Sequence, residues 1–107
     1  MNITHCVAWF FGGVFLMNAL PHVVSGSLGR PFQTPFAKPS GIGLSSSMIN
    51  MLWGFFNLVV AWALLARNGG LDLGAWEHAL ATGGGAFLMG LFHARHFGRL
   101  HGGHAPQ

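Results

Sequence analysis

The sequence has very few charged residues. Only 7% of its 107 residues are charged, with five Lys or Arg and two Asp or Glu, whereas a soluble domain carries about 25%. A water-facing surface cannot be built from that supply. Hydrophobic residues make up 51% of the chain, and its mean hydropathy is +0.49. The composition therefore predicts an integral membrane protein.

Cysteine is almost absent too, and the basic residues are not clustered. Cys6 is the only cysteine, which excludes an intramolecular disulfide and a cysteine-based zinc motif and leaves the redox compartment open. The five basic residues are scattered, without the stripe that would follow a nucleic acid backbone. We therefore expect no nucleic acid partner and interpret these residues as orientation signals and contacts to membrane lipids.

Three long apolar stretches account for most of the chain. About 20 apolar residues at 1.5 Å rise per residue span the hydrocarbon core. We expect an all-α membrane fold, a bundle of three transmembrane helices in a single domain over residues 1–100. The helices are predicted at about 3–24, 45–66 and 73–97, and residues 101–107 are predicted to form a flexible tail rich in His and Gly.

Local signals set the expected helix ends. Pro21 is expected to kink the last turns of the first helix, which we read as a retained span because no Lys or Arg precedes it and no small-x-small cleavage site is evident. One residue of Ser45-Ser46-Ser47 is expected to cap the second helix. Asp72 is the expected N-cap of the third.

The connection between the first two helices, residues 25–44, carries a Pro-Phe pair repeated at a four-residue spacing. Prolines lack an N–H donor, so extended backbone can lie in the membrane interface at lower cost. Phe32 and Phe36 are then expected to dip among acyl chains while Arg30 and Lys38 reach phosphates. The interpretation is an interfacial loop, with an ordinary turn-rich connector as the alternative.

Small residues recur every four positions in the third predicted helix, at Thr82, Ala86, Gly90 and Ala94. Apolar burial does not itself drive helix association in lipid, so such a seam favours close backbone approach. We expect this helix to be central in the bundle or to line an oligomer interface.

Basic residues next to the spans predict the orientation. Arg30, Lys38, Arg95 and Arg99 fall on one side of the three spans and Arg67 on the other. The N-terminus is expected in the periplasm and the C-terminus in the cytoplasm. The preference for Gly, Ala and Arg and the absence of Tyr suggest a bacterial chain, hence the inner membrane.

Four polar residues inside the first two helices form the first candidate site: Asn18, His22, Asn50 and Asn57. Asn18 and Asn50 each lie roughly 8 to 9 Å from the loop end of their predicted helix, so they are expected to meet. Such groups are costly in a membrane unless paired, so the cluster is either interhelical hydrogen bonding or a ligand site.

Histidines supply the second candidate site. His93 and His96 lie three positions apart and could face one metal ion, with His22 or another subunit completing the ligand set. The alternative is a helix end that contacts headgroups. A haem between His5 and His78, or between His22 and His93, is a further alternative, so the cofactor stays open.

Part of the pattern resembles a group of small bacterial multi-pass membrane proteins without an established activity. The motifs are N-A-x-P-H at 18–22, G-R-P-F-Q-x-P-F-A-K-P at 29–39 and L-W-G-x-x-N at 52–57. The resemblance covers the first helix to the middle of the second. It implies a membrane protein and transfers no catalytic residue.

These features leave two functional interpretations. The first is a non-enzymatic membrane component, either a homo-oligomer or an accessory subunit of a larger complex, held by the small-residue seam. The second is a ligand, lipid, metal or haem site at the cytoplasmic leaflet, covered by the Pro-Phe loop. An enzymatic activity is not favoured, because no acidic nucleophile or base accompanies the polar cluster.

Overall fold

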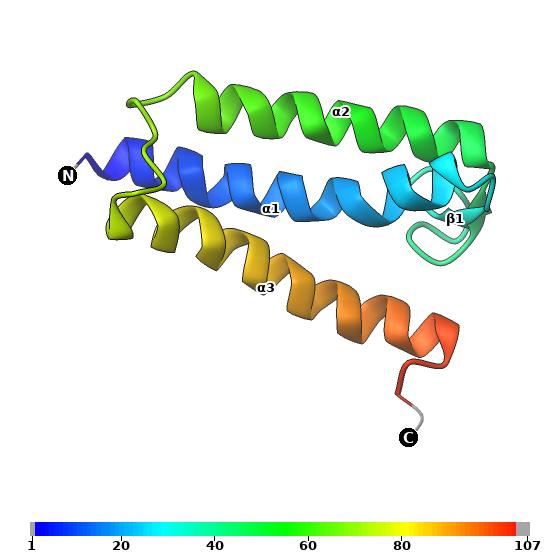
Figure 1. Ribbon diagram of the computed structural model, residues 1–107. Helices are drawn as coiled ribbons and strands as arrows, with labels where there is room; N and C mark the ends of the chain where they lie inside the picture. The colour runs from blue at the N-terminus through cyan, green and yellow to red at the C-terminus, as the bar shows by residue number, and fades with distance from the viewer. Residues whose placement is uncertain (1, 105–107) are drawn as a thin grey trace.

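The computed structural model describes residues 2–104 and is all-helical apart from one short ribbon (Figure 1). The prediction of three long helices is confirmed. The elements in chain order are α1 (Ile3–Ser27), β1 (Phe32–Gln33), β2 (Leu44–Ser45), α2 (Ser47–Ala66) and α3 (Trp76–His101).

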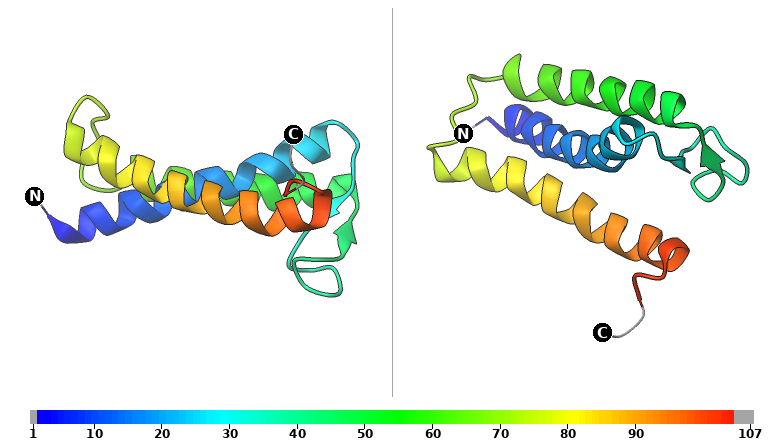
Figure 2. Two further views of the ribbon diagram at one scale, coloured as in Figure 1. Left: turned by 90° about the horizontal axis from the view of Figure 1, so that it is seen from below. Right: turned by 45° about the vertical axis from the view of Figure 1, so that its right-hand side comes forward.

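The three helices form an open layer with α1 in the middle (Figures 1 and 2). α2 runs antiparallel to α1 and α3 runs parallel to it. α1 packs against both neighbours, whereas α2 and α3 hardly touch each other within residues 2–104. The layer measures 41 × 32 × 22 Å. α3 leans away from α1 toward its C-terminal end, where the loop between α1 and α2 also lies (Figure 1).

α1 extends one turn beyond its predicted end. It continues through Pro21 to Ser27, and its last carbonyl groups accept hydrogen bonds from the amides that follow: Leu28 N to Val24 O at 3.1 Å and Arg30 N to Ser25 O at 2.8 Å. These bonds satisfy the helix end, so the chain need not unwind at residue 24.

The predicted ends of the other two helices need correction as well. α2 begins at Ser47, with Ser46 as its N-cap. α3 begins at Trp76, and its N-cap is Ala75, so the prediction of Asp72 as the cap is wrong. The Asp72 carboxylate instead accepts from Gly74 N at 2.9 Å within the connector.

At its other end α3 runs to His101 and stops at Gly102, whose φ of 75° is left-handed. His101, which was predicted to open the flexible tail, therefore belongs to the helix. The last three predicted tail positions, 105–107, lie outside the described residues.

The interfacial loop is more structured than the Pro-Phe repeat indicates. β1 and β2 pair antiparallel, with Phe32 opposite Ser45. Thr34 is 1% exposed, and its Oγ1 lies 2.5 Å from Ser45 Oγ and accepts from the next backbone amides. Phe36 and Lys38 are exposed, as expected of residues that meet lipid. Phe32 is instead half-buried, with its ring against Phe97 and His101, so it does not project outward as Phe36 does.

The interior of the layer is polar and small, and its outside is large and apolar. The largest fully buried side chains are Asn50, Asn57 and Thr34. Among residues 2–104, only three hydrophobic side chains are buried, Trp9, Ala19 and Ala61, while large apolar side chains of all three helices are exposed. This is the reverse of a soluble core. α1 and α2 are each long and apolar enough to cross a membrane.

The predicted small-residue seam meets α1 of the same chain along half its length. A Cβ added at Gly13 would overlap the backbone of Thr82 and Ala86. Gly90 lies beside the Met17 side chain, whereas Ala94 is exposed because α3 has by then diverged from α1. The seam is therefore an intrachain contact at Thr82 and Ala86.

The closest contact between α1 and α3 involves a glycine outside that seam. Gly85 is buried, and a Cβ there would overlap the carbonyl oxygen of Phe10. Gly83 and Gly84, which lie between Thr82 and Ala86 in the sequence, face open space instead. Close approach of the two backbones therefore depends on Gly13 and Gly85 together.

Candidate functional site

One polar chain joins all three helices near their middle. Asn18 Nδ2 donates to Asn57 Oδ1 at 2.9 Å, and Asn18 Oδ1 lies 2.9 Å from His93 Nε2. Since the amide oxygen can only accept, His93 donates from Nε2. Asn57 is fully buried and donates in turn to Trp53 O at 2.8 Å. The chain of bonds fixes α2 and α3 to the same residue of α1.

A second polar group lies closer to the loop. His22 Nδ1 is 2.7 Å from Asn50 Oδ1, and both side chains are buried. The Asn50 amide nitrogen lies 3.0 to 3.1 Å from three carbonyl oxygens, those of Phe32, Ser45 and Ser46. Asn50 therefore connects α1, the β ribbon and the start of α2.

The predicted pair of Asn18 with Asn50 is wrong. Asn18 lies nine residues before the end of α1, whereas Asn50 lies three residues after the start of α2. The extra turn of α1 and the later start of α2 put the two side chains at different depths. Antiparallel packing then pairs Asn18 with Asn57 and His22 with Asn50, so the four predicted residues form two groups.

Histidines of α3 hold the loop against the bundle. His96 Nε2 lies 2.7 Å from Gly41 O, and His101 Nε2 lies 2.8 Å from Gln33 Oε1. The Phe32 ring stacks on His101 with centroids 5.2 Å apart and planes 11° apart, and it packs 4.7 Å from Phe97. These contacts hold the ribbon and its loop against the end of α3.

Sequence reasoning missed Gln33 and His101. The spacing of His93, Phe97 and His101 at four-residue intervals marks one helical face, and extending the third helix past residue 97 would have revealed it. Nothing in the local sequence singles out Gln33, because its partner lies 68 positions away.

The structure does not assemble a metal site from the predicted histidines. Among residues 2–104 no group of three or more His, Cys, Asp or Glu side chains is placed to hold a metal ion. His93 and His96 bond to different oxygens, those of Asn18 and Gly41. We therefore find no ligand set for a metal at this pair.

The alternative haem position between His5 and His78 is blocked by a side chain. The Trp9 ring lies against both imidazoles, with centroids 6.0 Å from His5 and 4.1 Å from His78. The Trp9 indole nitrogen donates to Asn68 O at 2.9 Å, which fixes the ring there. A haem between these histidines would need the space that Trp9 fills.

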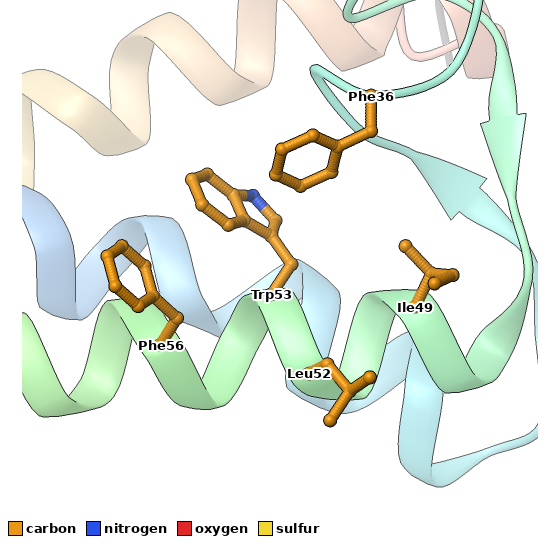
Figure 3. Close-up of a pocket in the computed structure, with 5 residues that line it drawn as sticks. All are labelled: Phe36, Ile49, Leu52, Trp53 and Phe56. Carbon is orange, nitrogen blue, oxygen red and sulfur yellow. The ribbon is translucent and has the colours of Figure 1, made fainter.

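An apolar pocket of about 290 Å³ opens beside the loop end of α2, lined by Phe36, Ile49, Leu52, Trp53 and Phe56 (Figure 3). Phe36 and Trp53 point toward each other, with ring centroids 5.0 Å apart and planes at 87°. The buried Trp53 Nε1 has no nitrogen or oxygen partner in the part of the chain that the structure describes. The Trp53 N–H can instead contact the face of the perpendicular Phe36 ring. The pocket suits hydrocarbon.

Charge is divided between the two ends of the layer. The loop end carries Arg30 and Lys38 in the loop and Arg95 and Arg99 at the end of α3. Both acidic residues of the chain, Asp72 and Glu77, lie at the opposite end, in the connector before α3 and in its first turn. The loop end is therefore strongly positive and attracts anions.

Comparison with known proteins gives no assignment: no family profile, curated protein or solved structure matches this chain significantly.

Proposed function

We propose that this chain is an integral membrane protein that crosses the bilayer three times and serves as a non-catalytic subunit of a membrane assembly. The observation that carries the first part is the reversed distribution of residues, with Asn50 and Asn57 fully buried and most large apolar side chains outside. In water this surface would drive aggregation, whereas in lipid it matches the solvent.

The third span is α3. Its 26 residues extend about 39 Å at 1.5 Å per residue, which exceeds the roughly 30 Å hydrocarbon core. Glu77 lies in its first turn, and Arg95 and Arg99 lie near its end, where they can reach the interfaces. The segment between Glu77 and Arg95 exposes large apolar residues: Leu80, Phe87, Leu88, Leu91 and Phe92.

The open layer supports a role as a subunit. α2 and α3 each pack against α1 only, as far as the described residues go, so one flank of each outer helix has no neighbour in the chain. The internal polar groups bond to one another and serve as interhelical contacts. A second copy, or another membrane protein, would complete the packing along α3.

Labelling of introduced cysteines is expected to place residues 40 and 100 on the cytoplasmic side and residue 73 on the periplasmic side. The orientation follows from the four basic residues at the loop end. Ser40→Cys, Leu73→Cys and Leu100→Cys would be made in a Cys6→Ser background and treated with a membrane-impermeant maleimide before and after lysis. Labelling of residue 100 together with residue 73 would show that α3 does not cross.

Purified in mild detergent, the protein is expected to form particles that contain more than one polypeptide. The double variant Phe87→Ala/Leu91→Ala should shift the particles toward single chains, because both side chains lie on the outer face of α3. Val59→Ala, exposed on α2, is the control. Light scattering coupled to gel filtration gives the mass. A strict monomer without co-purifying protein would contradict the role as a subunit.

A second function, ligand binding at the loop end, is favoured by one observation. Two adjoining cavities lie between the ends of α1 and α3, and Arg30 and His101 are among their walls.

A further inference from the structure

The first of these cavities lies beside the end of α1. Its volume is about 340 Å³, and its walls are Ser25, Arg30, Pro31, Phe32 and His101. The guanidinium and the hydroxyl are groups that donate hydrogen bonds to phosphate oxygens, whereas His101 Nε2 already donates to Gln33 Oε1. Pro31 supplies no backbone N–H, so the donors of this cavity come from side chains.

The turn after α1 fixes the backbone of Arg30, the cationic residue of this cavity. Gly29 has a φ of 70°, and Arg30 N then donates back to Ser25 O at 2.8 Å. The amides of Leu28 and Gly29 bond to other carbonyls of the last turn. Because these bonds occupy the carbonyls at the negative end of the helix dipole, Arg30 is the dominant charge of the cavity. Both acidic residues of the chain lie at the far end of the layer.

The second cavity is an open groove on the surface of the helix layer, next to the first. Its volume is about 560 Å³, and it lies where α3 diverges from α1, between Pro21 and the small residues Gly90 and Ala94. Phe32 and His101 line both cavities, so the two adjoin. The second is walled mainly by carbon.

The ring of His101 is held in place between the two cavities. Its Nε2 bonds to Gln33 Oε1 at 2.8 Å, and Phe32 stacks on its face. Apolar loop side chains such as Phe36 and Leu44 are exposed around this end. They set the Arg30 cavity at the depth of headgroups when the bundle lies in a bilayer.

We propose that these cavities form one binding site for an anionic phospholipid, with the phosphate at Arg30 and Ser25 and an acyl chain entering between Pro21, Gly90 and Ala94. The site rests on the proposed membrane-spanning arrangement. Positive charge without neighbouring carboxylates selects an anionic headgroup over a zwitterionic one, and the carbon-walled cavity distinguishes a lipid from a free phosphate.

Binding of phosphatidylglycerol to the full chain in mild detergent tests the site, with native mass spectrometry counting retained lipid. Arg30→Gln is expected to lower the affinity about tenfold, because one charge-assisted hydrogen bond is lost. Arg67→Gln removes the same charge at the opposite end and should bind as the unmodified chain does. Arg30→Lys should lose less affinity than Arg30→Gln.

Two further comparisons in the same binding experiment identify the ligand. Ala94→Leu fills the second cavity and should weaken phosphatidylglycerol binding, while phosphatidylcholine and soluble glycerol phosphate should bind weakly to every variant. Equal affinities of Arg30→Gln and Arg67→Gln would overturn the site, and so would glycerol phosphate binding as tightly as the lipid. Because both glutamine variants are compared as folded helical protein, this failure is distinct from a failed topology, which the cysteine labelling reports.

Discussion

Replacing Asn50 by alanine is expected to lower the free energy of unfolding by about 2 to 3 kcal/mol. The side chain is fully buried and bonds to His22 and to three backbone carbonyls, so its removal leaves a buried imidazole and the ribbon without partners. Leaving a buried hydrogen-bonding group without its partner costs about 1 to 3 kcal/mol, and here the His22 imidazole and the ribbon carbonyls both lose theirs. The unfolding transition in mixed micelles, followed by circular dichroism, measures the change.

Asn68→Ala is the matched control for Asn50. The Asn68 side-chain amide donates to two carbonyls, Ala63 O and Leu64 O, and both belong to the end of α2. We expect a loss of about 0.5 to 1 kcal/mol there. If the two variants melted alike, Asn50 would not hold the ribbon.

Asn18→Ala combined with Asn50→Ala should give additive losses, because these asparagines belong to separate groups.

Adding one methyl group to adjacent glycines of α3 is expected to change stability in opposite directions. Gly85→Ala places a Cβ against the Phe10 carbonyl oxygen and should destabilise the fold by about 1 to 3 kcal/mol, because backbone cannot yield as a side chain can. Gly84→Ala meets open space and should stabilise it by about 1 kcal/mol, because alanine is the better helix former.

The same unfolding measurement in micelles compares the two glycine variants. Both replace glycine by alanine in α3, so a difference in stability between them must come from their surroundings. Gly13→Ala should resemble Gly85→Ala, since its Cβ would meet the Thr82 backbone from the other side of the contact. Equal stabilities of the variants at positions 84 and 85 would show that α1 and α3 do not approach closely here.

The long helices were predictable because hydropathy and length act within each segment. Two of them are confirmed as long and apolar enough to cross a membrane, while the crossing itself, by these two and by α3, is part of the proposal. Helix ends were less predictable. The backward hydrogen bond from Arg30 N to Ser25 O extends α1, and the Asp72 carboxylate prefers its own connector to the helix cap.

The candidate site could be predicted in its members but not in its pairing. Asn18, His22, Asn50 and Asn57 stand out because polar residues are costly inside apolar helices. Which of them meet depends on the vertical register of α1 against α2, and a shift of one turn changes every pair. The ribbon and its Gln33 contact depend on residues far apart in sequence, so no local pattern reveals them.

The central position of α1 has a consequence for the order in which the protein is completed during synthesis. Once α2 has emerged, Asn57 can satisfy the Asn18 amide N–H and Asn50 can satisfy His22. The Asn18 oxygen, the Gly41 carbonyl and the Gln33 side chain must wait for His93, His96 and His101, which are translated last. In the proposed membrane arrangement, a nascent hairpin of α1 and α2 would therefore keep these polar groups unpaired, and the arrival of α3 would remove that penalty.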